Sequence, residues 1–210
     1  MKLRSWLAIG IIIIGIIVAT SFYTSHGTNN VGITIKTNGT GDTTQIYFNP
    51  SLSLNSPPSP MKNEIVETAL EDVDSYNSTA DSIKTDINNI AKKYGYTASV
   101  TIISQFGTDQ LPMLFQVNGT SMVPTLQNGQ NIMVLKTKDF QINDLVVAYY
   151  PPYNCLIVKR LTQINGDQVY LKADNTHVTT VPLGNGMVEI DTPLSTWDSR
   201  ENVIGVVKVY

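Results

Sequence analysis

The second half of the chain alternates apolar and polar residues in short runs, a pattern that predicts β-strands. Turn-forming Gly, Asn, Asp and Pro residues separate the runs. Seven candidate strands result, over residues 97–104, 113–117, 131–135, 145–150, 156–163, 168–172 and 203–209. The predicted fold class is therefore mainly β, with a β-domain over residues 111–210.

Ahead of this domain, apolar residues recur at helical spacing between residues 62 and 94. A break is expected at residues 77–79, and Tyr94-Gly95-Tyr96 should end the helical region. We therefore predict a helical accessory segment with one strand over residues 62–110. Residues 24–61 are rich in Thr, Asn, Ser and Pro, which predicts a flexible linker with at most one strand, at residues 31–36.

The N-terminus is apolar over residues 6–19 and is preceded by Lys2 and Arg4. Basic residues before an apolar stretch favour a cytoplasmic N-terminus. We expect residues 1–23 to form a single transmembrane helix that anchors the protein in the cell membrane and leaves the β-domain on the outer face. A secretory signal peptide cleaved near residues 19–21 is the alternative.

Composition narrows the range of functions. The chain has 14 basic and 17 acidic residues, a net charge of −3, and no basic patch, so nucleic acid is not an expected partner. Cys155 is the single cysteine, which excludes an internal disulfide and predicts a small core residue. His26 and His177 have no neighbours at metal-ligand spacing, so we predict neither a metal site nor a cofactor.

A serine and a lysine are the candidates for catalysis. A hydroxyl is a weak nucleophile until a base removes its proton, and a lysine can serve as that base when burial lowers its pKa. Strand alternation places Lys159 between the apolar side chains of Ile157 and Leu161 and directs Arg160 to the other face. Upstream, Ser121 lies in a loop with Gly119, which would allow a substrate to approach the backbone.

Several short segments together resemble the signal peptidase I family, the membrane-bound Ser/Lys peptidases with the LexA/signal peptidase fold. Gly119-Thr120-Ser121-Met122-Val123-Pro124-Thr125-Leu126 is similar to the nucleophile box of that family. The other matching segments, in the order of the family, are Asp144-Leu145-Val146-Val147, Val158-Lys159-Arg160, Gly166-Asp167 and Thr196-Trp197-Asp198-Ser199-Arg200.

The resemblance implies a role for each matching residue. Ser121 would be the nucleophile, Lys159 the general base, and Thr196 a hydroxyl that orients the lysine. Met122 and Pro124 would contact the substrate. The supporting residues would be Gly119, whose missing side chain leaves no second oxyanion donor, and an ion-pair network of Asp198, Arg200, Arg160 and Asp174.

The implied function is a serine endopeptidase that cleaves signal peptides from precursors with small residues, typically Ala, at the −1 and −3 positions. Its partners would be those precursors and membrane lipid. The chain departs from the family at Gln130, Asn143 and Ala173. These departures are expected to affect the geometry of the loops more than the Ser/Lys dyad. A LexA-like or dedicated-client processing peptidase and a non-catalytic anchored β binding module are the alternatives.

Overall fold

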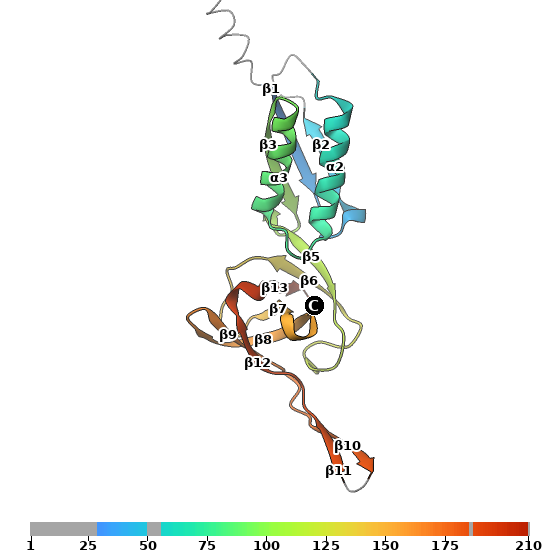
Figure 1. Cartoon of the computed structure of the whole chain (residues 1–210), viewed down its shortest axis with the longest axis vertical. Coiled ribbons are helices and arrows are strands. Elements are labelled where there is room, and N and C mark those ends of the chain that lie inside the picture. Colours follow the sequence, from blue (N-terminus) through green and yellow to red (C-terminus); the bar gives the residue numbers. More distant parts are fainter. Residues whose placement is uncertain (1–28, 50–55, 185–186, 210) are drawn as a thin grey trace, which may run out of the picture.

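The computed structural model describes residues 29–49, 56–184 and 187–209. Figure 1 shows two bodies, which we name the accessory domain and the β-domain, and a hairpin that extends from the β-domain. The accessory domain contains β1 (Asn29–Lys36), η1 (Gly41–Thr43), β2 (Gln45–Asn49), α2 (Ser59–Asp74), α3 (Ala80–Lys93), β3 (Tyr96–Ser104) and β4 (Gly107–Thr108). The β-domain contains β5 (Pro112–Gln116), β6 (Asn131–Lys136), β7 (Leu145–Tyr150), η2 (Pro151–Tyr153), β8 (Cys155–Asn165), β9 (Gln168–Lys172), β12 (Thr196–Ser199), η3 (Arg200–Asn202) and β13 (Val203–Val209), and the hairpin consists of β10 (Thr179–Gly184) and β11 (Met187–Asp191).

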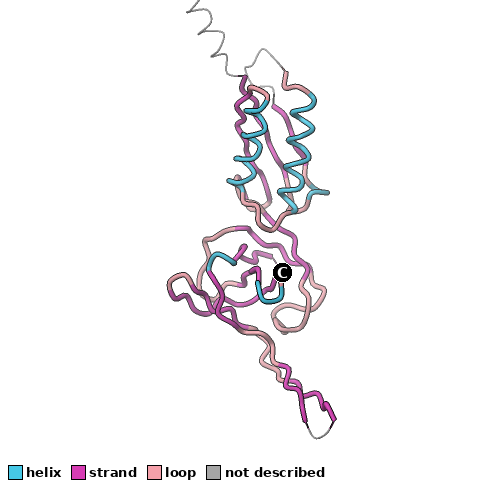
Figure 2. The backbone as a smooth tube through the Cα atoms, in the orientation of Figure 1, coloured by secondary structure: helices cyan, strands magenta, loops and turns pink. Residues whose placement is uncertain are grey.

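The two helices of the accessory domain pack their apolar faces on its sheet. Figure 2 shows this layer of helices in cyan, apart from the β-domain, which consists mainly of strands and loops. Thr79 caps α3 in a capping box with Ser82, which satisfies the first free N–H groups of the helix. The predicted helical region, its break and its end at Tyr94 are confirmed. The buried residues of the helices recur every four positions, at Met61, Ile65, Ala69 and Val73 in α2 and at Ile83, Ile87 and Ala91 in α3.

The prediction of a flexible linker over residues 24–61 is wrong for much of its length, whereas the strand expected within it at residues 31–36 is confirmed as part of β1. Residues 29–49 form β1, η1 and β2, and α2 begins at Ser59. The alternating residues Val31, Ile33 and Ile35 are at most 2% exposed and join the core under the helices. Because β1 pairs in parallel with β3, its main partner lies more than 60 residues away, beyond the reach of local sequence patterns.

The β-domain is built on a seven-stranded antiparallel sheet in the order β12-β9-β8-β7-β13-β6-β5. Its apolar side chains form two buried clusters. The mainly β fold and the seven strands predicted from the sequence are confirmed, whereas β2, β4, β10, β11 and β12 were not predicted. Strand β5 forms one edge of the sheet and leads directly into the loop that carries Ser121.

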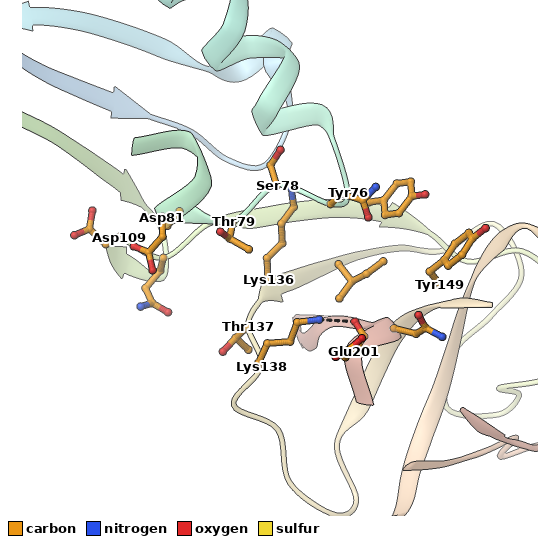
Figure 3. Close-up of a pocket in the computed structure, with 15 residues that line it drawn as sticks. Tyr76, Ser78, Thr79, Asp81, Asp109, Lys136, Thr137, Lys138, Tyr149 and Glu201 are labelled. Carbon is orange, nitrogen blue, oxygen red and sulfur yellow. Dashed lines mark hydrogen bonds between the residues drawn. The ribbon is translucent and has the colours of Figure 1, made fainter. Parts of the chain in front are cut away.

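A buried lysine connects the two domains. Lys136, at the end of β6, is 9% exposed, and its Nζ donates to the carbonyls of Val73 and Ser75 at the C-terminal end of α2. Beside it Tyr76 stacks on Tyr149 across the junction with ring centroids 6.0 Å apart. These residues line a cavity of about 480 Å³ between the domains (Figure 3). Burial lowers the pKa of Lys136 to about 8.

The predicted anchor, residues 1–23, lies outside the described residues. Within residues 29–49, 56–184 and 187–209, neither helix has the length and apolar character that a membrane span requires. The anchor therefore rests on the sequence pattern alone.

Candidate active site

Ser121 lies on a compact loop between β5 and β6. The loop is held from below by Met122 and Leu126, which are 1% and 0% exposed, and the Leu126 N–H donates to the Met122 carbonyl at 2.9 Å. The base of the loop is closed by the Val117 N–H, which donates to the Gln130 carbonyl at 2.8 Å. Ser121 itself is half-buried, so a positioned hydroxyl remains within reach of a substrate.

Gly119 gives this loop its shape. Its φ is +93°, in the left-handed region that favours glycine, and its N–H donates to Asn128 Oδ1 at 2.8 Å. A Cβ added there would meet no atom within 4 Å. The requirement for glycine is therefore the backbone conformation two residues before Ser121, rather than a shortage of space.

Lys159 approaches Ser121 from β8. Its side chain is buried, with 4% exposure, and its Nζ lies 2.5 Å from Ser121 Oγ. In the sheet Lys159 is paired with Val146 of β7, which is fully buried. Burial lowers the pKa of Lys159 to about 8, whereas the nearby Asp174 carboxylate acts in the opposite direction. The structure thus joins a hydroxyl to an amine whose neutral form is far more populated near pH 7 than that of an exposed lysine.

The Asp174 carboxylate is held by other partners. Arg160 Nε donates to Asp174 Oδ1 at 2.8 Å and Arg160 Nη2 to Oδ2 at 2.6 Å, and Thr125 Oγ1 donates to Oδ2 at 2.6 Å. The Arg160 guanidinium holds the pKa of Asp174 below its usual range. Since Asp174 is paired with Arg160, Lys159 is not drawn into an ion pair that would keep it protonated.

Asn175 is a site residue that sequence reasoning missed. Its N–H donates to the Ser121 carbonyl at 3.0 Å, and its Nδ2 donates to the Thr120 carbonyl at 3.1 Å. The loop that carries the hydroxyl is therefore tied to the segment that follows β9. The sequence signal that could have identified Asn175 was its position directly after Asp174, which the family resemblance had assigned to the site.

The hydrogen bond to Lys159 that the resemblance implies for Thr196 is absent from the described part of the chain. The Thr196 hydroxyl donates to the Trp197 carbonyl at 3.0 Å instead. The neighbouring hydroxyl of Ser195 accepts the Ala173 N–H at 3.0 Å, next to Asp174. The Thr196 hydroxyl, which its sequence position had assigned to Lys159, is thus bound to a backbone carbonyl of its own edge strand.

The expectation that Asp198 and Arg200 join the ion-pair network is wrong. Asp198 Oδ1 accepts from Asn202 Nδ2 at 2.7 Å, and its Oδ2 is buried without a hydrogen-bond partner among the described residues. Arg200 lies over the Phe140 ring, 4.7 Å from its centroid. In the sheet, β9 lies between β12, which carries Asp198, and β8, which carries Arg160.

The two residues expected to contact the substrate, Met122 and Pro124, differ in their exposure to solvent. Met122 is a core residue, which corrects its assignment to substrate binding. Pro124 is exposed on the loop, where its carbonyl accepts from Gln127 Nε2 at 3.1 Å. Cys155, expected in the core, is exposed at the start of β8, since the strand projects beyond its neighbour β9 there.

Chemically, the arrangement is suited to acyl transfer by a serine whose proton passes to a lysine. The residues that the structure describes contain no group of three or more His, Cys, Asp or Glu side chains able to hold a metal ion. The polar groups at this loop are instead Lys159 and the Asn175 N–H, which contact Ser121, and Asn175 Nδ2, which contacts Thr120.

Comparisons with known proteins identify the family to which the chain belongs. The profile of the family described as Peptidase S24-like matches residues 78–191, just over half of the chain, and this range includes Ser121 and Lys159. A protein named Signal peptidase I from Bacillus licheniformis is 37% identical over 68 residues, which cover 30% of this chain and 37% of that relative. The chain therefore belongs to the Peptidase S24-like family, which confirms at family level the resemblance to the signal peptidase I and LexA-type peptidases.

Proposed function

We propose that this protein is a membrane-anchored serine endopeptidase that removes signal peptides from exported precursors, with Ser121 as nucleophile and Lys159 as general base. The observation that carries the proposal is the 2.5 Å contact between Lys159 Nζ and Ser121 Oγ, made by a buried lysine. The name of the relative, Signal peptidase I, supports the substrate class. The apolar N-terminal segment of the sequence supports the anchor.

In the first step neutral Lys159 accepts the proton of Ser121 Oγ while the oxygen attacks the scissile carbonyl. The backbone N–H of Ser121 is the donor that we assign to the developing oxyanion. Collapse of the tetrahedral intermediate breaks the C–N bond, and the Lys159 ammonium returns its proton to the leaving amine. An acyl-enzyme on Ser121 remains.

In the second step neutral Lys159 accepts a proton from water, which attacks the ester carbonyl. The proton then passes to Ser121 Oγ as the acyl chain leaves. Arg160 supports both steps, because it holds the Asp174 carboxylate, whose charge raises the pKa of Lys159, in an ion pair of its own.

The test is cleavage of a model precursor with an Ala-x-Ala site by the full-length chain in detergent. Wild type should cut after the last Ala, and Ser121→Ala should show no cutting above background, since it lacks the nucleophile. Thermal melting of both proteins controls for folding. Cutting by Ser121→Ala would exclude the proposed nucleophile, and a folded wild type that cuts no precursor would favour a dedicated client or a binding module.

The pH profile should identify the base. The active form of Lys159 is the neutral amine, and its pKa is about 8, so the active fraction grows as the pH rises toward that value. We expect kcat/KM to increase by about tenfold per pH unit on the acid side and to level off above the pKa. Initial rates with one peptide, alongside melting curves at each pH, provide the measurement. A profile that is flat or falls over the same range would contradict a lysine base.

A further inference from the structure

A cavity of about 450 Å³ opens beside Ser121, on the surface of the β-domain. One wall is the nucleophile loop, with Thr120 and Ser121, and another is η2, with Tyr153. The remaining walls flank the hairpin at the points where the chain enters and leaves it: Asn175 and His177 precede β10, and residues 192–194 follow β11. The cavity is thus continuous with the candidate nucleophile but is built from segments that the dyad does not use.

Two strand edges lead to the dyad. Strand β5 is the edge of the sheet and runs into the Ser121 loop; its Leu114 N–H donates to the Gly39 carbonyl at 3.4 Å. Among the described residues, residues 155–159 of β8 pair with β7 only, because β9 begins to pair at Arg160. An extended substrate can bind by adding a strand to such an edge. We place on these edges the acyl part of the substrate, which stays attached to Ser121 until water releases it.

The cavity contains no residue of β5 or β8 among its walls. A substrate strand held on those edges would therefore reach the cavity only with the residues beyond Ser121, on the other side of the scissile bond. Those residues belong to the leaving group, which departs first and needs a side-chain pocket rather than a long strand pairing.

Tyr153 provides a preformed aromatic surface in this cavity. Its side chain is 72% exposed and borders the cavity, so its ring is accessible to a ligand there. It is carried by a 3₁₀ turn that begins with Pro151 and Pro152, and its ring meets that of Tyr150 edge-on at 5.5 Å. An aromatic side chain held in this way loses little conformational entropy on binding.

Among the described residues, the walls carry no carboxylate, ammonium or guanidinium group. A charged substrate side chain would lose hydration there without gaining a counter-ion. The phenol of Tyr153, the imidazole of His177 and the apolar Leu194 are instead suited to an uncharged aromatic side chain, which can stack on one ring and cover the others.

We propose that this cavity binds an uncharged aromatic side chain at the first or second residue on the leaving-group side of the cleaved bond, with Tyr153 as the specificity-determining residue. The inference rests on the proposed peptidase function and extends it from the signal-peptide side to the start of the released protein.

The test compares peptides that share one Ala-x-Ala segment and differ only after the cleavage site, with Tyr or Gly at the first or second position. We expect the full-length chain in detergent to favour a Tyr peptide by about three- to tenfold in kcat/KM, a range typical of one aromatic pair. In Tyr153→Ala the ratio of the two rates should fall to near one. Tyr47→Ala, which removes an exposed ring from β2 of the accessory domain, should keep the wild-type ratio.

A third peptide with Tyr before the cleavage site separates the two sides of the bond. The proposal is overturned if wild type shows no preference after the bond, if Tyr153→Ala keeps it, or if Tyr153→Ala changes only the preference before the bond. Binding of a short Tyr-bearing leaving-group peptide to Ser121→Ala, with and without Tyr153→Ala, gives a readout that needs no catalysis. Binding that depends on Tyr153 without any cleavage would uphold the cavity and refute the peptidase, whereas absence of such binding counts against the cavity alone.

Discussion

Replacing Lys159 with methionine is expected to reduce kcat/KM for an Ala-x-Ala precursor by about 10³- to 10⁴-fold, because the Ser121 hydroxyl then has no base. Methionine has a similar length and is apolar, so the buried site next to Val146 can accommodate it without an unpaired charge. Folding should therefore survive the change. Rates from long incubations, with melting curves for each protein, provide the measurement.

Lys136 provides a matched control for this experiment. It is also buried, and burial lowers its pKa to about 8 as well, but its Nζ donates to the carbonyls of Val73 and Ser75 rather than to a serine. Lys136→Met should weaken the junction between the domains and leave cleavage within about threefold of wild type. Equal losses of activity in the two folded variants would mean that a buried lysine as such, and not the contact with Ser121, is what cleavage requires.

Gly205→Ala is expected to destabilise the protein by about 3 kcal/mol or more, the upper range for overpacked positions. Gly205 lies in β13 opposite Lys136 of β6, in the middle of the seven-stranded sheet. A Cβ built there would lie 2.1 Å from the Leu135 carbonyl oxygen and 2.8 Å from its carbon. Since these are backbone atoms of a central strand, they cannot move aside without breaking the pairing of β13 with β6.

Urea unfolding of the two proteins, followed by circular dichroism, measures this difference. Gly32→Ala in β1 is the matched control, because it is also a strand glycine but the atom nearest to its added Cβ would be the Asn49 Cβ, at 3.3 Å. We expect that change to shift stability by about 1 kcal/mol or less. A Gly205→Ala protein as stable as Gly32→Ala would show that the sheet can separate β6 and β13 at this point.

Local patterns were sufficient for most elements of the fold. Alternation in residues such as Val31, Ile33 and Ile35 marks a strand, and the four-residue repeat of Ile83 and Ile87 marks a helix, because each element buries one face. These local patterns could not predict which strands pair with one another. The contact of β1 with β3 depends on a register between residues far apart in sequence, which is why the strand at residues 31–36 was expected within a linker and not within a folded domain.

The supporting residues of the site also show that local sequence does not determine contacts between distant residues. Family position assigned Thr196, Asp198 and Arg200 to the surroundings of Lys159, but their contacts are with the Trp197 carbonyl, Asn202 and the Phe140 ring. Asn175, which no role had been assigned to, reaches the nucleophile loop with two hydrogen bonds. Such contacts depend on which side chain or carbonyl is nearest after folding.

By itself the sequence determined the strand and helix periodicity, the family resemblance and the pairing of a candidate serine with a candidate lysine, since these depend on residue type and spacing. Only the tertiary structure decided that Lys159 is buried and lies 2.5 Å from Ser121, and that Asp174 is paired with Arg160. The chemistry of an amine depends on its hydration and its neighbours. Both are properties of the space that β8, the β5–β6 loop and the segment after β9 enclose together, and no single stretch of chain contains them.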